Sequence, residues 1–513
     1  MKKRALFRIV PLAAVFILFF SHGFIERDKT GFLAVKGGDI IDASGRPVLL
    51  KGFNVEFKHF KEILGEEDIK KISGTGANSI RLALDYRDFE SSPFKFSENS
   101  FSLLDSVLSW CEKYHVYVIL DMHLAPGIQN PHDFVVHRES SFAFWSAKEY
   151  QERFYSLWAE IAERYSGKKI IAGYDLLNEG VPPDTDEYLD IINRVVSRIR
   201  SYDRNHILIV QEAIMHNGRK ELFLIDDRNT IYSIHFFYPS QFTFYVTTTN
   251  RAITTYPGNM VTYGEKIGET RSISMTGNNG WEKMTVTAVP PEGAEILVVK
   301  LSSENNAGTV CFDNISLNAD GLIVELPAPG VSNSSFETDY PGISWNTYGS
   351  CVTTTDRASL TGKSSLSFSG CGSHASAQSS PIEVKKGVYS LSAWYRTENA
   401  SGENLISLSW HRKKILMPVE RRSLLENIRY AIRFKSRHNV PLYVGEFTAH
   451  ANPSGESVVN YLNDLIDIMK IEGFHWSFWE YYSEYPGIGI YTNDRRLVNP
   501  EASDSLKEHM RPD

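Results

Sequence analysis

The sequence is poor in cysteine and has no excess of basic charge. Four cysteines among 513 residues are too few for a scaffold held together by disulfides. The 54 basic and 62 acidic side chains give a net charge of −8, so the composition gives no indication of a nucleic-acid partner.

Motifs for cofactors are also missing. The sequence has no glycine-rich phosphate loop, and His132, Asp133 and His137 follow an i, i+1, i+5 spacing that fits no zinc pattern. A solvated or substrate-facing loop is the favoured interpretation of that segment. The sequence therefore predicts no metal and no other cofactor.

The N-terminal segment, residues 1–23, has the form of a secretory signal peptide. Basic side chains precede an apolar run, Ile9–Phe20, which small residues follow. The run is shorter than the roughly 20 residues of a membrane-spanning helix. An uncleaved membrane anchor is the alternative, because the small residues match the usual cleavage pattern poorly. We therefore expect an exported chain, either secreted or tethered to a membrane.

Export would permit a disulfide bond among Cys311, Cys351 and Cys371, although the sequence does not select the pair. Cys111 lies in a segment with helical periodicity, where a buried free thiol is expected.

Most of the chain alternates between strand-like and helix-like patterns. Apolar runs typical of buried strands occur at 49–55, 78–84, 116–122, 170–177, 206–211, 230–236, 442–447 and 474–479. Segments with helical periodicity separate them, at 66–73, 100–114, 147–165, 186–202, 421–437 and 457–471. This alternation predicts a parallel sheet with crossover helices, and eight strands close a (β/α)₈, or TIM, barrel. We expect the barrel in two parts, residues 31–245 and 415–513.

Residues 246–414 interrupt the alternation between the sixth and seventh strands. The segment is far longer than the roughly 2–6 residues usual for such a loop, so it must carry its own fold. It is rich in Ser, Thr, Gly and Asn and contains short alternating runs such as Ala294–Leu301 and Gly387–Tyr395. We therefore predict an inserted antiparallel β-sandwich of jelly-roll type.

Polar residues stand at the carboxyl end of each predicted barrel strand, where the active site of such a barrel lies. They are Asn54, Arg81, Asp85, Asp121, His123, Asn178, Glu179, Gln211, Glu212, His235, Tyr238, Glu446, Trp479 and Glu480.

Glu179 and Glu446 end strands four and seven, which face each other across a barrel of eight. A retaining glycosidase needs two carboxylates roughly 5–5.5 Å apart, one as nucleophile and one as acid and then base. Taken alone, Asn178 and Glu179 could begin a helix, and Glu446 could be a helix-start carboxylate. Two glutamates at opposite strand ends favour catalysis.

With these residues in place, the sequence resembles glycoside hydrolase family 5, the cellulase-like family of retaining β-glycosidases with glutamates on strands four and seven. The matching pieces, in the family's order, are Arg81-Leu82, Asp121–Gly127, Leu177–Glu179, His235–Pro239, Gly445–Phe447 and Trp476–Trp479.

The resemblance implies a role for each matching residue. It makes Glu446 the nucleophile and Glu179 the general acid/base, with Asn178 on the neighbouring sugar hydroxyl. The other implied roles are Arg81 and Tyr238 keeping the nucleophile ionised, His123 and His235 lining the subsite, and Trp479 as an exposed aromatic platform. A cation near Glu446 would lower its pKa, while a less polar setting would raise that of Glu179.

One position departs from the family pattern, which commonly has Pro after the acid/base glutamate. Here that residue is Gly180, which predicts a more flexible loop on the acceptor side. Glu480 and Glu212 are candidates for sugar contact or for structural ion pairs.

The insertion resembles the jelly-roll carbohydrate-binding modules found beside polysaccharide hydrolases. Val331–Glu337, Trp345 and Gly387–Trp394 look like the opening half of such a module, and Gly280–Glu282 and Gly308–Leu317 like its closing half. Because the closing half comes first, we predict a circularly permuted module, with two incomplete modules as the alternative. The insert either binds glycan or only stabilises and spaces the barrel.

The sequence thus predicts an exported retaining β-glycosidase whose partner is an oligosaccharide or polysaccharide, a β-linked glucan or a related glycan. Transglycosylation, or action on mannan or a glycoconjugate, would use the same mechanism. A non-catalytic glycan-binding barrel protein is the alternative from a different class.

Overall fold

The computed structural model describes residues 31–511, except 131–142, 216–218, 245–250, 253–254, 325–335, 337–344, 350, 356–357, 380, 452 and 486. The expected signal segment, 1–23, and the loop with His132, Asp133 and His137 lie outside the described residues. Within the described ranges, no helix is both long and apolar enough to cross a membrane.

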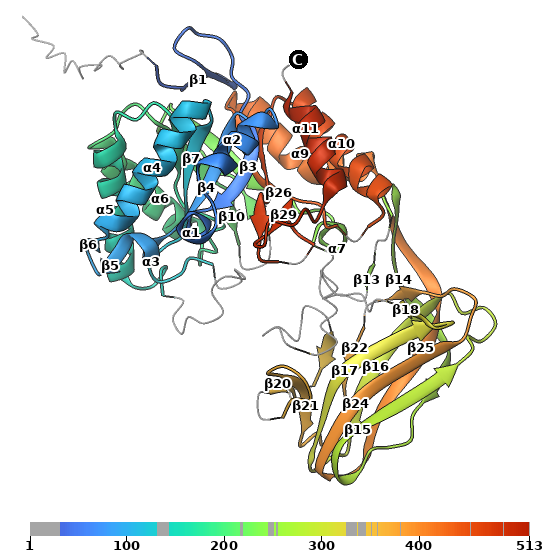
Figure 1. Cartoon of the computed structure of the whole chain (residues 1–513). Coiled ribbons are helices and arrows are strands. Elements are labelled where there is room, and N and C mark those ends of the chain that lie inside the picture. Colours follow the sequence, from blue (N-terminus) through green and yellow to red (C-terminus); the bar gives the residue numbers. More distant parts are fainter. Residues whose placement is uncertain are drawn as a thin grey trace, which may run out of the picture.

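Eight parallel strands form a closed barrel (Figure 1). In chain order they are β3 (Lys51–Glu56), β4 (Ser79–Asp85), β7 (Tyr117–Leu124), β8 (Ile171–Asp175), β9 (Ile207–Gln211), β12 (Thr230–His235), β26 (Leu442–Phe447) and β27 (His475–Phe478). Nearly every residue of these strands is buried, because helices cover the outside and side chains fill the interior. The predicted barrel is confirmed.

Helices surround the barrel and begin and end at recognisable signals. The long ones are α2 (Glu66–Gly74), α4 (Glu98–Tyr114), α5 (Lys148–Tyr165), α6 (Thr185–Arg200), α9 (Arg421–His438), α10 (Gly455–Ile471) and α11 (Pro500–Met510). The side chain of Ser97 caps α4 and that of Asp184 caps α6. The helix α11 is not among the predicted helical segments, although Asn499 caps it and Pro500 occupies its first turn.

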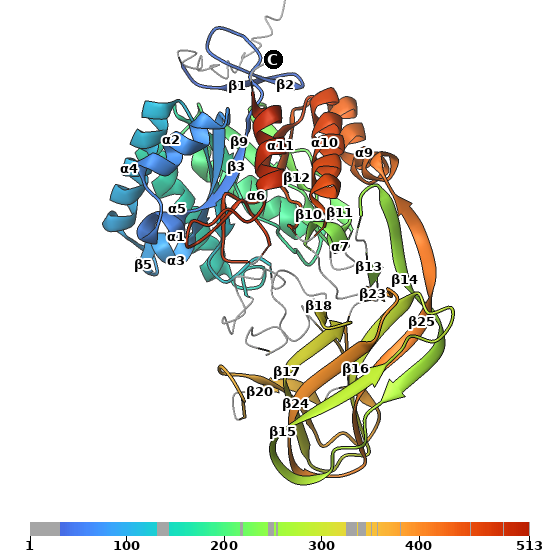
Figure 2. The same cartoon turned by 45° about the vertical axis from the view of Figure 1, so that its right-hand side comes forward.

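Short elements decorate both ends of the barrel. They are the helices α1 (Phe57–Glu62), α3 (Tyr86–Phe89) and α7 (Ser240–Thr243), and the strand pairs β1 (Ala34–Lys36) with β2 (Asp39–Ile41), β5 (Glu90–Ser92) with β6 (Lys95–Phe96), β10 (Ala213–Ile214) with β11 (Lys220–Glu221), and β28 (Tyr482–Ser483) with β29 (Tyr491–Thr492). Leu33 and Ile40, from the β1–β2 hairpin, pack against the inward-facing Ile119, Ile209 and Ile231. The hairpin therefore covers one end of the barrel (Figure 2). The carboxyl ends of the strands, with the candidate active-site residues, lie at the other end.

Two antiparallel sheets lie between β12 and β26 in the sequence. One contains β13 (Arg251–Ala252), β14 (Gly258–Arg271), β25 (Glu403–Val419), β16 (Ile296–Glu304), β22 (Ala375–Gln378), β19 (Asn346–Tyr348) and β23 (Ile382–Glu383). The other contains β15 (Gly277–Ala288), β24 (Tyr389–Ala400), β17 (Thr309–Ala319), β21 (Ser365–Ser369), β20 (Val352–Thr355) and β18 (Leu322–Val324). This is the predicted extra β domain.

The inner faces of the two sheets share one apolar core. Leu297 and Trp410 come from one sheet, and Phe312, Phe368 and Leu391 from the other. The paired strands β14 and β25 run from the barrel into this core (Figure 2), so the predicted boundary at residue 414 falls inside β25. The permuted order of the module stays a prediction, because most of 325–344 lies outside the described residues.

A disulfide bond joins Cys351 and Cys371, two of the three cysteines that the sequence analysis put forward, while Cys111 and Cys311 are buried free thiols. The sequence separation is 20 residues. Closing a loop of that size lowers the conformational entropy of the unfolded chain, which stabilises the folded chain by about 3 kcal/mol. Replacing both cysteines by serine should therefore lower the unfolding free energy of the sandwich by roughly that amount. Calorimetry on the full chain measures this, and the transition of the barrel, which the substitutions do not touch, is the internal control. An unchanged sandwich transition in the double variant would contradict it.

His475 in β27 makes folding sensitive to acid. Its Nδ1 accepts the backbone N–H of Leu50 at 3.1 Å, and burial, with a smaller contribution from the charge of Lys435, lowers its pKa to about 3. Since the unfolded chain binds this proton more readily, the contribution to stability is complete above the unfolded pKa and is lost as the pH falls. Between about pH 6.5 and pH 5 the loss amounts to roughly 2 kcal/mol.

His475→Asn keeps an acceptor near the position of Nδ1 and does not titrate. The slope of unfolding free energy against pH between pH 7 and pH 5 should therefore become shallower in this variant. Urea denaturation at several pH values measures the slope, and His115→Asn, at an exposed helix end, is the control. Equal slopes for His475→Asn and the parent chain would refute the prediction.

Candidate active site

Arg81 organises the carboxyl ends of the barrel strands. It lies on β4, is fully buried, and forms ion pairs with Asp121 (2.8 Å), Asp175 (2.8 Å) and Glu446 (2.7 Å). A guanidinium presents several N–H groups in a fixed fork, so it can serve several carboxylates at once. Burial raises the pKa of Asp175 to about 6; Arg81 opposes this shift and Asp121 adds to it.

Asparagine and glutamine side chains complete the surroundings of Arg81. The Oδ1 atoms of Asn54 and Asn178 accept from its two terminal nitrogens at 3.0 and 2.9 Å. Gln211 accepts the backbone N–H of Glu179 at 2.9 Å through Oε1. Because the oxygen of Asn178 is turned towards Arg81, its amide nitrogen is turned away from it, which leaves a donor for a ligand.

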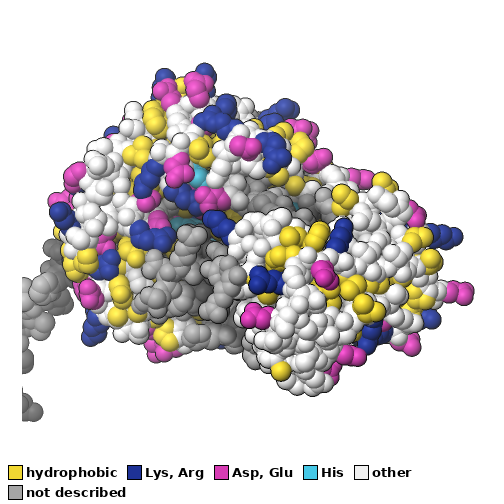
Figure 3. Space-filling model, turned by 60° about the horizontal axis from the view of Figure 1, so that its bottom comes forward, with side chains coloured by type: hydrophobic (Ala, Val, Ile, Leu, Met, Phe, Trp, Pro, Cys, Tyr) yellow, Lys and Arg dark blue, Asp and Glu magenta, His cyan; other side chains and the backbone are white. Residues whose placement is uncertain are grey.

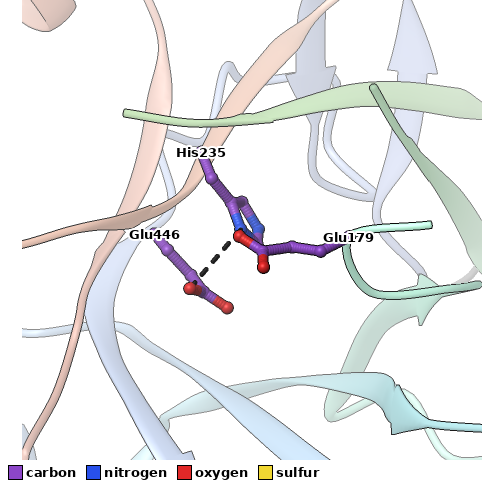
Figure 4. Close-up of side chains that lie close together, drawn as sticks. All are labelled: Glu179, His235 and Glu446. Atoms are coloured by element: carbon purple, nitrogen blue, oxygen red, sulfur yellow. Dashed lines mark hydrogen bonds and ion pairs between the residues drawn. The ribbon is translucent and has the colours of Figure 1, made fainter. Parts of the chain in front are cut away.

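His235 connects the two glutamates (Figure 4). Its Nδ1 lies 2.8 Å from Oε1 of Glu179 and 3.4 Å from Oε2 of Glu446. Glu179 follows β8 with a positive φ of 43°, while Glu446 and His235 lie on the neighbouring strands β26 and β12. In a view towards this end of the barrel, histidine side chains show between acidic and basic side chains at the mouth (Figure 3).

The carboxylates of Glu179 and Glu446 are close enough to act on one bond. Together with His235 they offer three donor atoms that all lie within 4.8 Å of one another. This separation is near the roughly 5–5.5 Å of retaining glycosidases and well below the roughly 6.5–9.5 Å of inverting ones. The same three atoms could ligate a divalent cation, but the Arg81 guanidinium 2.7 Å from Glu446 disfavours one there.

The protonation preferences of the free site are the reverse of those expected from the sequence. Burial raises the pKa of Glu446, although His235 and Arg81 lower it. For Glu179, burial also raises the pKa, but His235, Lys220 and His123 outweigh it and bring the value to about 2. His235 contacts Glu179 more closely than Glu446, a difference that has no signal in the sequence.

Trp479 and His123 form a stacked pair with ring centroids 5.3 Å apart and an interplanar angle of 11°. His123 is held in turn by Asp121, whose Oδ2 lies 2.9 Å from its Nδ1. Trp479 is only 8% exposed, so it is less accessible than the exposed platform that the sequence analysis expected.

The contacts that the structure describes for Tyr238 do not include Glu446. Its hydroxyl lies 3.5 Å from the sulfur of Met417, on the strand that returns from the sandwich. Tyr238 lies beyond the end of β12, where its ring contacts that of Phe236 and packs against the barrel's hydrophobic cluster. The implied contact between Tyr238 and Glu446 is therefore wrong.

Glu480 is 1% exposed, and burial, with a contribution from the charge of Glu56, raises its pKa well above the ordinary range. Its Oε2 has no hydrogen-bond partner within the described part of the chain. This carboxyl group therefore favours its neutral form. The structure describes no ion pair for Glu480, whereas Glu212, the other candidate, pairs with Lys220 at 2.7 Å.

Two loop residues that the sequence analysis missed support the site. Gln129 is buried and donates to the carbonyl groups of His123 (2.7 Å) and Asn178 (2.9 Å), which joins the loops after strands three and four. Its own carbonyl accepts from the indole of Trp145 at 2.8 Å. Trp145 also packs against Gly180, where an added Cβ would lie 3.2 Å from its ring, so this glycine occupies a confined position. No periodic signal marks such loop residues.

The fold and site together define a (β/α)₈ barrel with paired glutamates at the ends of its fourth and seventh strands. Residues 41–287 match the model of the cellulase family, glycosyl hydrolase family 5. Endoglucanase C of Acetivibrio thermocellus is 33% identical over 190 residues, which cover 36% of this chain and 54% of that protein. A beta-xylosidase of Phanerodontia chrysosporium is 29% identical over 245 residues, 40% of this chain and 51% of that one.

Over residues 41–287 the chain is therefore similar to glycoside hydrolase family 5. It spans about half the length of the curated relatives it matches. Among solved structures, the endoglucanase Cel5A of Thermotoga maritima is similar at 15% identity with a TM-score of 0.48, covering 89% of this chain and 96% of that one.

Proposed function

We propose that the protein is a retaining β-glycosidase that hydrolyses a β-linked glucan. The observation that carries this proposal is the pair Glu179 and Glu446, with carboxylate oxygens within 4.8 Å at the ends of strands four and seven. That spacing leaves no room for a water molecule between carboxylate and sugar, so direct attack by one glutamate is the chemistry it supports.

Glu446 attacks the anomeric carbon while Glu179 gives its proton to the departing glycosidic oxygen. This forms a glycosyl ester on Glu446 and releases the leaving sugar. Glu179, now ionised, takes a proton from water as the water oxygen attacks the same carbon and the ester bond breaks. Two inversions at one carbon give net retention.

The lowered pKa of Glu179 in the free site is compatible with its role as acid. Its side chain is 25% exposed, and burial is the largest influence that raises its pKa. A bound sugar would cover the exposed part and so favour the protonated form. Ester formation then removes the charge of Glu446, which lowers the pKa of Glu179 and suits its second role as base.

Names of relatives support a β-glucan as substrate. The relatives include endoglucanase C of Acetivibrio thermocellus and cellodextrinase A of Ruminococcus flavefaciens, the latter 32% identical over 35% of this chain and 52% of that protein. In the site, the amide nitrogen of Asn178 would bind the hydroxyl beside the reacting carbon, with the Trp479–His123 pair beside the sugar. Export by the N-terminal segment agrees with a polymeric substrate.

The test is the stereochemistry of hydrolysis. Proton NMR of fresh digests of cello-oligosaccharides and mixed-linkage β-glucan should show the β-anomer first, with the α-anomer growing only by mutarotation. An initial α-anomer, or no hydrolysis of any β-glucan, would overturn the proposal.

We also propose that the sandwich binds glycan and extends the cleft, since it leaves the barrel from the end of strand six. Affinity electrophoresis of the full chain carrying Glu446→Gln, compared with a chain lacking 258–419, measures this. Equal mobility of both chains in gels with and without β-glucan would refute it.

A further inference from the structure

The backbone of His235 is held by an ion pair from outside the catalytic group. Oε1 of Glu212 accepts the backbone N–H of His235 at 3.2 Å, and the ammonium group of Lys220 donates to its carbonyl oxygen at 2.8 Å. Lys220 and Glu212 are themselves joined at 2.7 Å. The two charged side chains thus bind both polar groups of one peptide residue and each other.

Three separate elements supply this arrangement. Glu212 directly follows β9 and donates its own backbone N–H to the carbonyl of Ser233 at 2.9 Å, which fixes it against β12. Lys220 begins β11 of the small hairpin after β9, and Tyr430, on α9, donates its hydroxyl to Oε2 of Glu212. Glu212 is 4% exposed at its side chain and Lys220 is 35% exposed. A carboxylate this buried needs all of these donors.

The imidazole of His235 makes its polar contacts through Nδ1, to the two glutamates, and its ring meets that of Phe237 edge to face. Its Nε2 is buried and makes no hydrogen bond to the described residues. On that side the ring meets Gly445, where an added Cβ would lie 3.1 Å from Nε2. The position of Nδ1 between the two glutamates therefore depends on where the backbone of His235 is held.

We propose that Lys220 and Glu212 are positioning residues that hold His235 between Glu179 and Glu446 and so set the geometry of the reaction. The inference rests on the proposed function. The charge of Lys220 acts in the same direction, because it contributes to lowering the pKa of Glu179. Neither residue touches the sugar in this account.

Lys220→Met removes the donor to His235 and leaves Glu212 with Tyr430. A displacement of the imidazole by a fraction of an ångström should lower kcat roughly 10- to 100-fold, while KM changes less than about 3-fold. Glu212→Gln keeps the shape and loses the charge, and should lower kcat by a smaller factor. Lys113→Met, which breaks the exposed pair with Glu66, is the matched control and should keep full activity. If Lys220→Met does not fold, Glu212→Gln carries the test.

A double-mutant cycle separates positioning from general stability. If Lys220 acts through His235, Lys220→Met should cost almost nothing further in a His235→Gln background. Additive losses, or kcat within 2-fold of the parent in both folded variants, would overturn the proposal.

A readout without activity distinguishes this inference from the proposed function. In protein labelled with ¹³C at histidine Cε1, the His235 signal, assigned through His235→Gln, should shift in Lys220→Met and not in Lys113→Met. An unmoved signal in Lys220→Met would overturn the positioning role. If the signal shifts in Lys220→Met but the parent chain hydrolyses no glucan, only the proposed function is overturned.

Discussion

Glu446→Gln is expected to lower kcat on a cello-oligosaccharide by roughly 10⁴-fold or more, because the amide cannot form the glycosyl ester. The site keeps its shape, since the amide oxygen can still accept from Arg81, which lies 2.7 Å from Oε1 of the carboxylate. KM should therefore change little. Initial rates over a range of oligosaccharide concentrations give both constants.

The smaller variant Glu446→Gly opens space for an external nucleophile. Azide should restore turnover of an aryl β-glycoside with a good leaving group and give the α-glycosyl azide, because only one inversion then occurs. The exposed Glu112→Gln, on α4, is the control and should keep full activity. A β-glycosyl azide from Glu446→Gly, or full activity of Glu446→Gln, would contradict the assignment of the nucleophile.

Arg81→Met should be the most destabilising single substitution in the barrel. It leaves Asp121, Asp175 and Glu446 buried without their common cation, which costs roughly 3–5 kcal/mol of unfolding free energy. Activity should be lost as well, since Glu446 would take up a proton. Chemical denaturation at neutral pH measures the first effect and initial rates measure the second.

The destabilisation by Arg81→Met should shrink as the pH falls towards 5. Without the guanidinium, the carboxyl groups have pKa values raised above those of the unfolded chain, so the folded state binds more protons and gains stability in acid relative to the parent. Arg164→Met, which removes partly exposed pairs with Glu98 and Glu160, should cost less than about 1 kcal/mol at either pH. A loss for Arg81→Met that is equally small, or that grows in acid, would contradict this account of the buried cluster.

Sequence patterns were sufficient for the barrel because its strands are buried on both faces. Such strands appear as uninterrupted apolar runs, and their polar ends mark the carboxyl edge, so Glu179 and Glu446 could be found at the correct strands. The insertion was visible because a gap of that length cannot be a simple loop. The helix α11 stands where a (β/α)₈ barrel places a helix after its eighth strand, but its apolar periodicity is weak because Ser503 and Ser505 are among its buried residues.

Contacts that depend on loop conformation or on side-chain rotamers could not be predicted from the sequence. The motif around Tyr238 does not show that its hydroxyl lies against Met417, because this residue follows the end of β12 in an irregular segment. Which of the two glutamates has the lower pKa depends on which carboxylate lies closer to Nδ1 of His235. The two distances, 2.8 Å to Glu179 and 3.4 Å to Glu446, differ by less than an ångström. Lys220 reaches the site through a two-residue strand with no periodic signature.

Covalent labelling tests the central claim most directly. A 2-deoxy-2-fluoro cellobioside with an activated leaving group should inactivate the enzyme in a time-dependent way and add one fluorinated disaccharide, because the fluorine slows breakdown of the glycosyl ester more than it prevents labelling. Peptide mass mapping should place the added mass on Glu446, and Glu446→Gln should not be labelled. A label on any other residue, together with full activity of Glu446→Gln, would contradict the two-glutamate mechanism.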